Sequence, residues 1–463
     1  MTDKILWGVT FGAHDAAIAV FVNNELVFAT DAERFSRKKN DSVIPSALIE
    51  YVENKYGMPD KVYYYENPIL KSLRRTWAGQ RPRIVIPKFK YNLTYSNHHE
   101  SHAAYGYYTS PFDECTVLVI DAIGEWDTLT TWQAKNGKLK RKGLHWRYPK
   151  SLGLFYSAAT QAAGWKPNEE EYIMMGAAAI GEITHKGYSR LSELWKNKFN
   201  FHRGVKLNDM DPLEIAACAQ ALYESLFHQI LIKANPELGP LVFVGGCALN
   251  VKANSQLNPC DVHIPPNPGD AGSAIGCVLS RIQQKISPSP YLGYEIKGEY
   301  PVDEIVKKLR KKKIIGVAKG KAEFGPRALG NRSLLGDPSV KNIKDIMNKI
   351  KGREKFRPFA VMILKEDVQK YFSGSVNSPY MNVAYKTHSI TDKKYPGIVH
   401  ADGTTRLQIV DDSDSHRRLL EAWKKKTGCP MILNTSLNIK GEPIVNDEFD
   451  VKKFTLNTGV EVL

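Results

Sequence analysis

The sequence has little of what marks a secreted or membrane-spanning protein. Its six cysteines are scattered without a C-x-x-C pair, so neither a disulfide framework nor a zinc ribbon is predicted. No apolar run approaches the roughly 18 to 20 residues that span a bilayer. The opening MTDKILWGVTFG lacks the charged-then-apolar layout of a signal peptide. We therefore expect a cytoplasmic protein with no membrane partner.

Acidic residues are also in short supply. The 463 residues include 49 Asp and Glu against 64 Lys and Arg, which gives a net charge of +15 and a pI near 9.3. A chain this basic attracts polyanions or anionic small molecules before any specific contact forms. With 43% hydrophobic residues and this length, the chain is predicted to fold into two or more domains, each with its own core.

Two segments share one layout of strands and turns. One runs from Ile5 as ILWGVTFGAHDAAIAVFVNNELVFATDAERFSR, and the other from Cys115 as CTVLVIDAIGEWDTLTTWQAKNGKLKRKG. Each reads as an apolar strand, a turn, a second strand, a tight hairpin and a third strand. This repeat predicts an α/β fold with a duplicated actin/Hsp70-like ATPase-type domain, although two unrelated hairpins would give the same pattern.

Later segments indicate the domain boundary. A helix is predicted from Pro212, with Asp211 as its N-cap, and it leads to a buried strand that ends in Gly245-Gly246. Ser and Pro residues follow in RIQQKISPSPYLGYEIKG, which reads as a linker. We therefore expect one domain over residues 1–290 and a smaller α/β domain over residues 291–463.

The stretch NHHESHAA places two histidines on one face of a predicted helix. His98 and His102 are four residues apart, so both imidazoles could reach one metal ion. Asp121, at the end of a strand, and Asp270, among small residues, are the candidate remaining ligands. Taken alone, such a pair is more often a capped or surface pair than a metal site.

Several longer blocks resemble the O-carbamoyltransferase family that modifies antibiotics and nodulation factors. They include FGAHDAAIAVF, NHHESHAAYGYYTSPF, VIDAIGEW and NPGDAGSAIG, and later AEFGPRALGNRSLLGDP, KGREKFRPFA and CPMILNTSLNIKGEPIV. The resemblance implies a first domain similar to the threonylcarbamoyladenosine synthesis ATPase and a smaller carbamoyladenylate-forming, YrdC-like domain. One block departs from the family pattern, because GEYKVMGLAPYG is here EEYIMMGAAAIG.

The resemblance implies roles for residues of the first domain. His98, His102, Asp121 and Asp270 would bind a divalent metal, iron or zinc, and His14 would act as a general base or as a donor to the reacting carbamoyl group. The expected nucleotide contacts are Gly176, Gly245, Gly246 and Asn250.

The second domain is predicted to bind carbamoyl phosphate and ATP, because guanidinium groups bind phosphate bidentately. The implied binding residues are Arg327, Arg332, Lys351, Arg353, Arg357, Asn434 and Ser436, of which Arg327, Lys351 and Arg357 are also counted as catalytic. His400, Asp402, Arg406 and Gln408 are secondary candidates. ATP, with Mg²⁺, and carbamoyl phosphate would give carbamoyladenylate, which an acceptor hydroxyl then attacks.

The basic charge raises the question of the acceptor. Cations alternate with aromatic residues just before the histidines, and this pattern suits a nucleic-acid strand. The candidate contacts are Arg74, Arg75, Trp77, Arg81, Arg83, Lys88 and Lys90. We hypothesise a 5-hydroxymethylpyrimidine in DNA, flipped out of the duplex, as the acceptor. A small-molecule hydroxyl is the alternative, followed by a kinase on the same scaffold and by a nucleic-acid-binding protein without activity; a homodimer is also possible.

Overall fold

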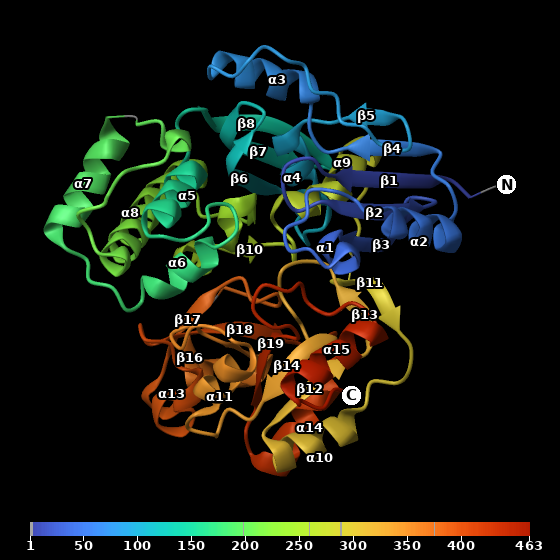
Figure 1. Cartoon of the computed structure of the whole chain (residues 1–463), viewed down its shortest axis with the longest axis vertical. Coiled ribbons are helices and arrows are strands. Elements are labelled where there is room, and N and C mark those ends of the chain that lie inside the picture. Colours follow the sequence, from blue (N-terminus) through green and yellow to red (C-terminus); the bar gives the residue numbers. More distant parts are fainter. Residues whose placement is uncertain (1–2, 198, 259, 288, 375) are drawn as a thin grey trace. The chain divides into compact units, whose positions relative to one another are not determined.

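The computed structural model describes residues 3–197, 199–258, 260–287, 289–374 and 376–463. The chain divides into two compact units (Figure 1). The first comprises Met1–Ser36 and Asn40–Ser289, and the second comprises Arg37–Lys39 and Pro290–Leu463. Each unit is an α/β structure with its own sheets.

Two five-stranded sheets form the frame of the first unit. Their orders are β3-β2-β1-β4-β5 and β10-β9-β6-β7-β8. The strands of the first sheet are β1 (Ile5–Thr10), β2 (Ala17–Val22), β3 (Glu25–Asp31), β4 (Lys61–Tyr64) and β5 (Leu93–Tyr95). Those of the second are β6 (Cys115–Gly124), β7 (Asp127–Lys135), β8 (Lys138–Arg147), β9 (Leu241–Val244) and β10 (Val262–His263).

The two sheets repeat one topology. In each, three successive strands pair antiparallel, and two later strands continue parallel to the first of them. Both hairpins turn on residues with positive φ, Asn23 and Asn24 in the first sheet and Asn136 and Gly137 in the second, as hairpins with tight turns require. The predicted duplicated ATPase-type fold is confirmed.

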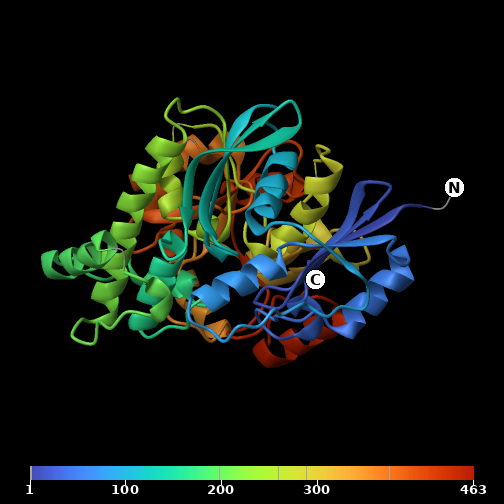
Figure 2. The ribbon, with the colours of Figure 1, turned by 90° about the horizontal axis from the view of Figure 1, so that it is seen from above.

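Helices pack on both sheets of the first unit. They are α1 (Glu33–Ser36), α2 (Ser46–Tyr56), α3 (Pro68–Trp77), α4 (His98–Tyr108), α5 (Leu152–Ala162), α6 (Glu171–Ala177), α7 (His185–Lys196), α8 (Pro212–Ala234) and α9 (Ser273–Ile282). Figure 2 shows α4 and α9 side by side, between the blue strands of the first sheet and the teal strands of the second. A Cβ at Gly276 of α9 would lie 1.8 Å from the carbonyl oxygen of Ser101, so only glycine permits this approach.

Helix α8 begins as predicted. The Asp211 side chain caps it by accepting a hydrogen bond from the Leu213 amide, and a proline follows at the first helical position. By length and composition α8 is the one described helix that could cross a membrane, and 61% of its most apolar window is buried inside the fold.

The second unit is built on a seven-stranded mixed sheet in the order β12-β14-β19-β15-β18-β17-β16. These strands are β12 (Ile314–Ala318), β14 (Arg332–Gly336), β19 (Met431–Ser436), β15 (Ala360–Leu364), β18 (Thr404–Val410), β17 (Ala384–Thr387) and β16 (Phe372–Ser373). A separate ribbon pairs β11 (Tyr291–Ile296) with β13 (Gly320–Glu323). The helices are α10 (Val302–Lys312), α11 (Ile343–Ile350), α12 (Val368–Tyr371), α13 (Ser389–Lys394), α14 (Arg417–Thr427) and α15 (Glu448–Thr458).

The strand directions give this sheet two chemically distinct sides at the ends of its strands. We call each such side, where strands begin and end, an edge of the sheet. Strand β14 runs antiparallel to both β12 and β19, and β19 runs antiparallel to β15. The start of β14, the end of β19 and the start of β15 therefore meet at one edge. The start of β12, the end of β14 and the start of β19 meet at the opposite edge.

Candidate active site

Four side chains of the first unit converge as a buried cluster. His98 and His102 lie one turn apart on α4, Asp121 lies in β6, and Asp270 lies in a short 3₁₀ turn just before α9. One ligand atom from each lies within 4.8 Å of all the others, and all four residues are buried. Helix α4, strand β6 and the start of α9 thus bring together residues up to 172 positions apart in the sequence.

The distances show how tightly these groups face one another. The Nε2 atom of His98 lies 2.9 Å from Oδ2 of Asp121 and 3.4 Å from Oδ1 of Asp270. The Nε2 atom of His102 lies 3.2 Å from the same Asp270 oxygen and 3.2 Å from Nε2 of His98. Two imidazole nitrogens and two carboxylate oxygens thus point at one small volume.

The electrostatics of this cluster favour bound positive charge. Burial would raise the pKa of Asp121, but His98 and His102 lower it to about 2. Burial would likewise lower the pKa of His98, but Asp270 and Asp121 raise it well above its usual value. A divalent ion would balance the charge of the two carboxylates. Imidazole nitrogen and carboxylate oxygen together suit iron or zinc, so the residues present fit such an ion.

Two further carboxylates support the cluster, and the sequence analysis missed both. The Oε2 atom of Glu66 lies 3.9 Å from Nδ1 of His98, and Lys71 pairs with its other oxygen. The Oε1 atom of Glu125 accepts hydrogen bonds from the backbone amides of His98 and Asn67. Glu125 directly follows β6 and Glu66 lies two residues after β4, positions that could have marked them. Groups of this kind orient metal ligands.

His14 lies in the first turn of the repeated unit, with 38% of its side chain exposed. Its Nδ1 atom lies 3.0 Å from Oδ2 of Asp15. Burial lowers its pKa, but the hydrogen bond to Asp15 and the charge of Asp270 outweigh that and raise the pKa to about 10. A protonated imidazole at this position would suit a hydrogen-bond or proton donor.

The four predicted nucleotide contacts lie in different surroundings. Gly245 has a φ of +95°, and a Cβ there would lie 2.2 Å from the carbonyl oxygen of Ile120. The amide of Gly246 donates to Oδ1 of Asp121 over 3.2 Å, so this turn adjoins the buried cluster. Asn250 instead exchanges side-chain hydrogen bonds with Gln220. Gly176 lies within α6.

In the second unit, several predicted arginines gather near one edge of the large sheet. Arg406 lies on β18, beside Ala360 of β15. The pKa of Arg406 is well below its usual value because the side chain is buried and because of the charges of Arg327, Arg353 and Arg357. These three guanidinium groups therefore lie near Arg406. The Nε atom of Arg406 is buried without a hydrogen-bond partner among the described residues. Arg406, only a secondary candidate from the sequence, is thus central to this group.

Two other predicted phosphate ligands are already engaged within the fold. The guanidinium of Arg332 is fully buried and donates to five backbone carbonyls, those of Tyr294, Lys319, Gly320, Asn331 and Asn446. The ammonium of Lys351 donates to backbone and side-chain oxygens of Ser436 and Asn438. Burial, Arg353 and Arg357 lower its pKa well below the usual value. Both residues hold loops at this edge.

Asn434 and the secondary candidates line the same edge. The side-chain amide of Asn434 donates to the Ala328 carbonyl and to Oε1 of Gln408, whereas its Oδ1 atom is buried with no partner in the described part of the chain. The Nε2 atom of His400 lies 2.8 Å from the Phe359 carbonyl. An open acceptor therefore lies beside the arginine group. The Ser436 hydroxyl donates to Asn438.

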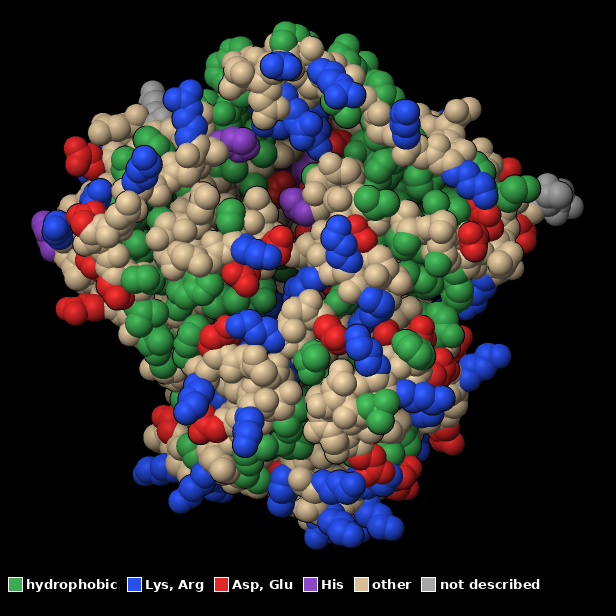
Figure 3. Space-filling model, in the orientation of Figure 1, with side chains coloured by type: hydrophobic (Ala, Val, Ile, Leu, Met, Phe, Trp, Pro, Cys, Tyr) green, Lys and Arg blue, Asp and Glu red, His purple; other side chains and the backbone are tan. Residues whose placement is uncertain are grey.

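The predicted nucleic-acid residues fall into two groups. Arg74 is buried and donates to the Glu125 carbonyl, and Lys90 pairs with Glu53. Arg75 is half-buried, whereas Trp77 is 63% exposed. The remaining three, Arg81, Arg83 and Lys88, are exposed. Figure 3 shows a hollow in the face of the first unit, with acidic and histidine side chains in it and Lys and Arg at its edge.

Comparisons with known proteins cover both units. A sequence model of the carbamoyltransferase C-terminus matches residues 306–463, and one of the carbamoyltransferase N-terminus matches residues 63–237 and 202–279. An uncharacterized protein of Synechocystis sp. is 30% identical over 98% of this chain and 95% of its own length. A 3′-hydroxymethylcephem-O-carbamoyltransferase of Amycolatopsis lactamdurans is 26% identical over 96% and 95%.

One solved structure similar to part of the chain is component A of (R)-2-hydroxyglutaryl-CoA dehydratase from Acidaminococcus fermentans. It covers 60% of this chain and 99% of its own, at 14% identity and a TM-score of 0.38. The family matches span the buried histidine and aspartate cluster as well as the arginine group. The chain therefore belongs to the carbamoyltransferase family and is a transferase.

Proposed function

We propose that this protein is an ATP-dependent O-carbamoyltransferase whose two units catalyse successive steps. The observation that carries the proposal is the match of both family models, one to each unit. The opposite charge character of the two candidate sites supports it. A group of arginines suits phosphate-rich substrates, whereas a histidine and aspartate cluster suits a divalent ion.

We assign the first step to the arginine edge of the second unit. Carbamoyl phosphate, water and MgATP would give carbamoyladenylate, phosphate and pyrophosphate. Arg406, with Arg327, Arg353 and Arg357, would bind the phosphates. The open Oδ1 of Asn434 would accept a hydrogen bond from the carbamoyl NH₂ group. Lys351 and Arg332 would keep their structural contacts and hold the loops around this site.

We assign the second step to the first unit. The acceptor oxygen would attack the carbamoyl carbon, the bond to the AMP oxygen would break, and AMP would leave. A divalent ion on His98, His102, Asp121 and Asp270 would neutralise phosphate charge and orient the reacting group. Cationic His14 would donate a hydrogen bond to the departing phosphate or to the carbonyl oxygen. The glycine turn Gly245-Gly246 would let the nucleotide approach the backbone closely.

The acceptor is the finer part of the proposal. A 5-hydroxymethylpyrimidine in DNA is one candidate, supported by exposed Trp77, Arg81, Arg83 and Lys88 near the basic segment. A small-molecule hydroxyl is the alternative. It is supported by the relative whose name gives a hydroxymethylcephem as its substrate, and by Arg74 and Lys90 being engaged within the fold.

The direct test supplies radiolabelled carbamoyl phosphate, MgATP and either hydroxymethylcytosine DNA or a panel of small alcohols. Label on DNA that falls about tenfold in an Arg81→Ala/Arg83→Ala/Lys88→Ala variant would support the DNA acceptor, because those side chains would bind phosphates. Label on small alcohols alone, unchanged in that variant, would exclude DNA as the acceptor.

The cytoplasmic location and the homodimer stay predictions.

Nucleotide products test the whole proposal against the other two classes. Carbamoyl activation releases AMP and pyrophosphate, a kinase on this scaffold releases ADP, and a binding protein releases neither. ADP formed in proportion to acceptor consumption would contradict the proposed reaction.

A further inference from the structure

The edge of the second unit's sheet opposite the arginine group carries a second basic site. The start of β12, the end of β14 and the start of β19 meet there, next to the carboxyl-terminal ends of α10 and α14. None of the proposed catalytic or phosphate-binding residues lines this site. It therefore needs an explanation of its own.

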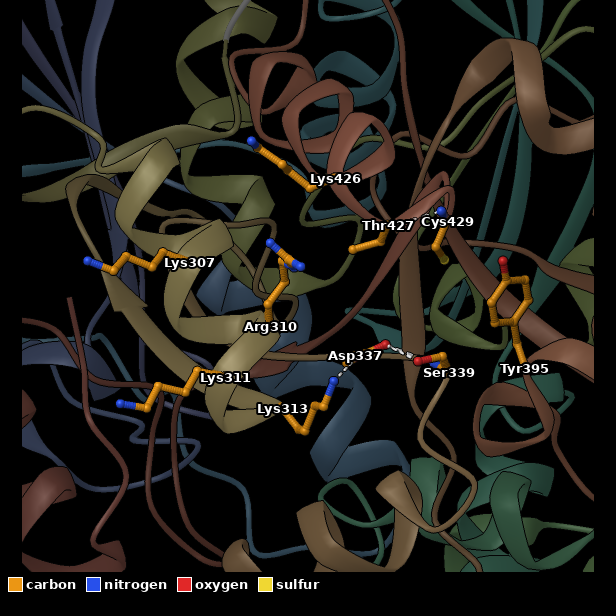
Figure 4. Close-up of a pocket in the computed structure, with 10 residues that line it drawn as sticks. All are labelled: Lys307, Arg310, Lys311, Lys313, Asp337, Ser339, Tyr395, Lys426, Thr427 and Cys429. Carbon is orange, nitrogen blue, oxygen red and sulfur yellow. Dashed lines mark hydrogen bonds and ion pairs between the residues drawn. The ribbon is translucent and has the colours of Figure 1, made fainter.

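A cavity of about 600 Å³ opens at this edge. It is lined by Lys307, Arg310, Lys311, Lys313, Asp337, Ser339, Tyr395, Lys426, Thr427 and Cys429. Asp337, Tyr395 and Cys429 are buried, whereas the five cations are exposed. In Figure 4, Arg310 and Lys313 stand between the outward-reaching Lys307 and Lys311 on one side and Asp337 with Ser339 on the other.

The charge of this cavity is not balanced by the protein. Asp337 pairs with Lys313 over 3.0 Å and also accepts a hydrogen bond from the Ser339 hydroxyl. Within the described residues, the side chains of Lys307, Arg310, Lys311 and Lys426 form no ion pair. By contrast, Lys308 and Lys312 of the same helix pair with Glu461. Four of the five cations that line the cavity therefore have no carboxylate partner in the described part of the chain.

Favourable contact with the helix dipoles does not explain this arrangement. Cations in the last turn of a helix do stabilise it. However, Lys312 on α10 and Lys425 on α14 lie in the same last turns and would serve that purpose equally. What distinguishes Arg310 and Lys426 is that both line one cavity although they belong to different helices.

We propose that this cavity binds a small anion with two or more linked phosphates, such as pyrophosphate or the phosphate chain of a nucleotide. Five cations from α10, the residue that follows it and the end of α14 are spread around about 600 Å³, which matches several phosphate groups better than one. A nucleic-acid strand fits less well, because Tyr395 is the one aromatic residue of the lining and is only 6% exposed, which leaves no platform for a base.

The test measures binding of inorganic tripolyphosphate to the full-length protein by equilibrium dialysis at low and at 0.15 M salt. An Arg406→Gln background weakens the contribution of the arginine edge. In that background, Arg310→Ala/Lys426→Ala should weaken binding by about tenfold, because each cation lost removes charge-assisted hydrogen bonds. The matched control, Arg418→Ala/Lys425→Ala, removes one arginine and one lysine from exposed positions of α14 outside the lining and should weaken binding by less than about threefold.

Three results would overturn the proposal. Tripolyphosphate could fail to bind the Arg406→Gln protein at all. The two double variants could weaken binding equally, which would indicate a response to net charge alone. A DNA duplex could displace tripolyphosphate and lose its own binding in Arg310→Ala/Lys426→Ala, which would assign the cavity to a nucleic-acid backbone. Melting curves of both double variants verify that the fold is retained.

Discussion

The two candidate sites differ in how their charges are balanced. In the first unit, two imidazoles face two carboxylates within a few ångströms, so the cluster contains both signs of charge. In the second unit, burial and the neighbouring charges of Arg327, Arg353 and Arg357 lower the pKa of Arg406, and Glu354 lies 3.7 Å from Arg357. The first site suits a small cation, whereas the second suits an anionic ligand.

The difference in charge balance predicts how each site contributes to the stability of the fold. Buried groups of opposite sign support one another in the folded chain, although their desolvation is costly. Buried groups of like sign repel, so we expect the buried charge of Arg406 to cost stability until an anion binds. Activity and stability should therefore change together at the first site and in opposite directions at the second.

The largest expected effect comes from breaking the balanced cluster. His102→Ala should lower carbamoyl transfer to the acceptor by more than about 100-fold, because loss of even an outer-shell partner of a metal ligand costs 10- to 100-fold. Bound iron or zinc, measured by elemental analysis, should fall in parallel. Carbamoyl-phosphate-dependent exchange of pyrophosphate into ATP, assigned to the second unit, should persist.

His228 provides the control for that variant, since it is an exposed histidine on α8. His228→Ala should retain both the metal and the transfer activity. Equal metal content in wild type and His102→Ala would show that the cluster is not the metal site.

Arg406→Gln should have a smaller effect on catalytic rate than His102→Ala, and it should raise stability while it lowers activity. Pyrophosphate exchange should fall by about 10- to 100-fold, because charge-assisted hydrogen bonds to phosphate are lost. The melting temperature without ligand should rise by about 2 °C or more, since a buried cation beside three others is removed. Calorimetry checks the second part, and a melting temperature that falls with activity would contradict the unbalanced-charge interpretation.

The smallest effect concerns Glu125. Burial raises the pKa of its carboxyl group from 4.5 to about 7, although hydrogen bonds from the amides of Asn67 and His98 act in the opposite direction. A carboxyl group with a raised pKa holds its proton more tightly when folded. Its contribution to stability is therefore fully present below pH 4.5 and is lost as the pH rises to about 7. Glu125→Gln should be more stable than wild type at pH 8 by about 1–3 kcal/mol and equally stable near pH 4.

Chemical denaturation at both pH values measures that difference. Glu237→Gln, at an exposed position, is the control and should show no such dependence on pH. A Glu125→Gln protein that is less stable than wild type at pH 8 would show that the carboxylate is ionised in the fold and stabilises it.

Local chemistry predicted several features well. The four-residue spacing of His98 and His102 places them on one helix face whatever packs around it. Asp211 and Pro212 specify the start of α8, and the repeated strand pattern specifies two sheets of one topology. Each of these depends on residues that are neighbours in the sequence, so sequence alone is sufficient to predict them.

The roles of individual polar residues were decided by contacts between distant segments. Arg332 resembles a phosphate ligand by sequence, but carbonyls from residues as far apart as Tyr294 and Asn446 occupy its guanidinium. Arg406 was only a secondary candidate for phosphate binding, because its neighbours in the sequence do not show that three other arginines lie near it in the fold.

The sequence by itself determined the family, the helical pair of histidines and the inventory of cations. Only the tertiary structure decided which carboxylates support the histidines, that the Nε atom of Arg406 is buried without a partner in the described residues, and which lysines face a cavity. The physical reason is that the balance of a charged group depends on its neighbours within a few ångströms. In the second unit's sheet, some of those neighbours come from distant segments, since Ser333 of β14 pairs with Ser436 of β19.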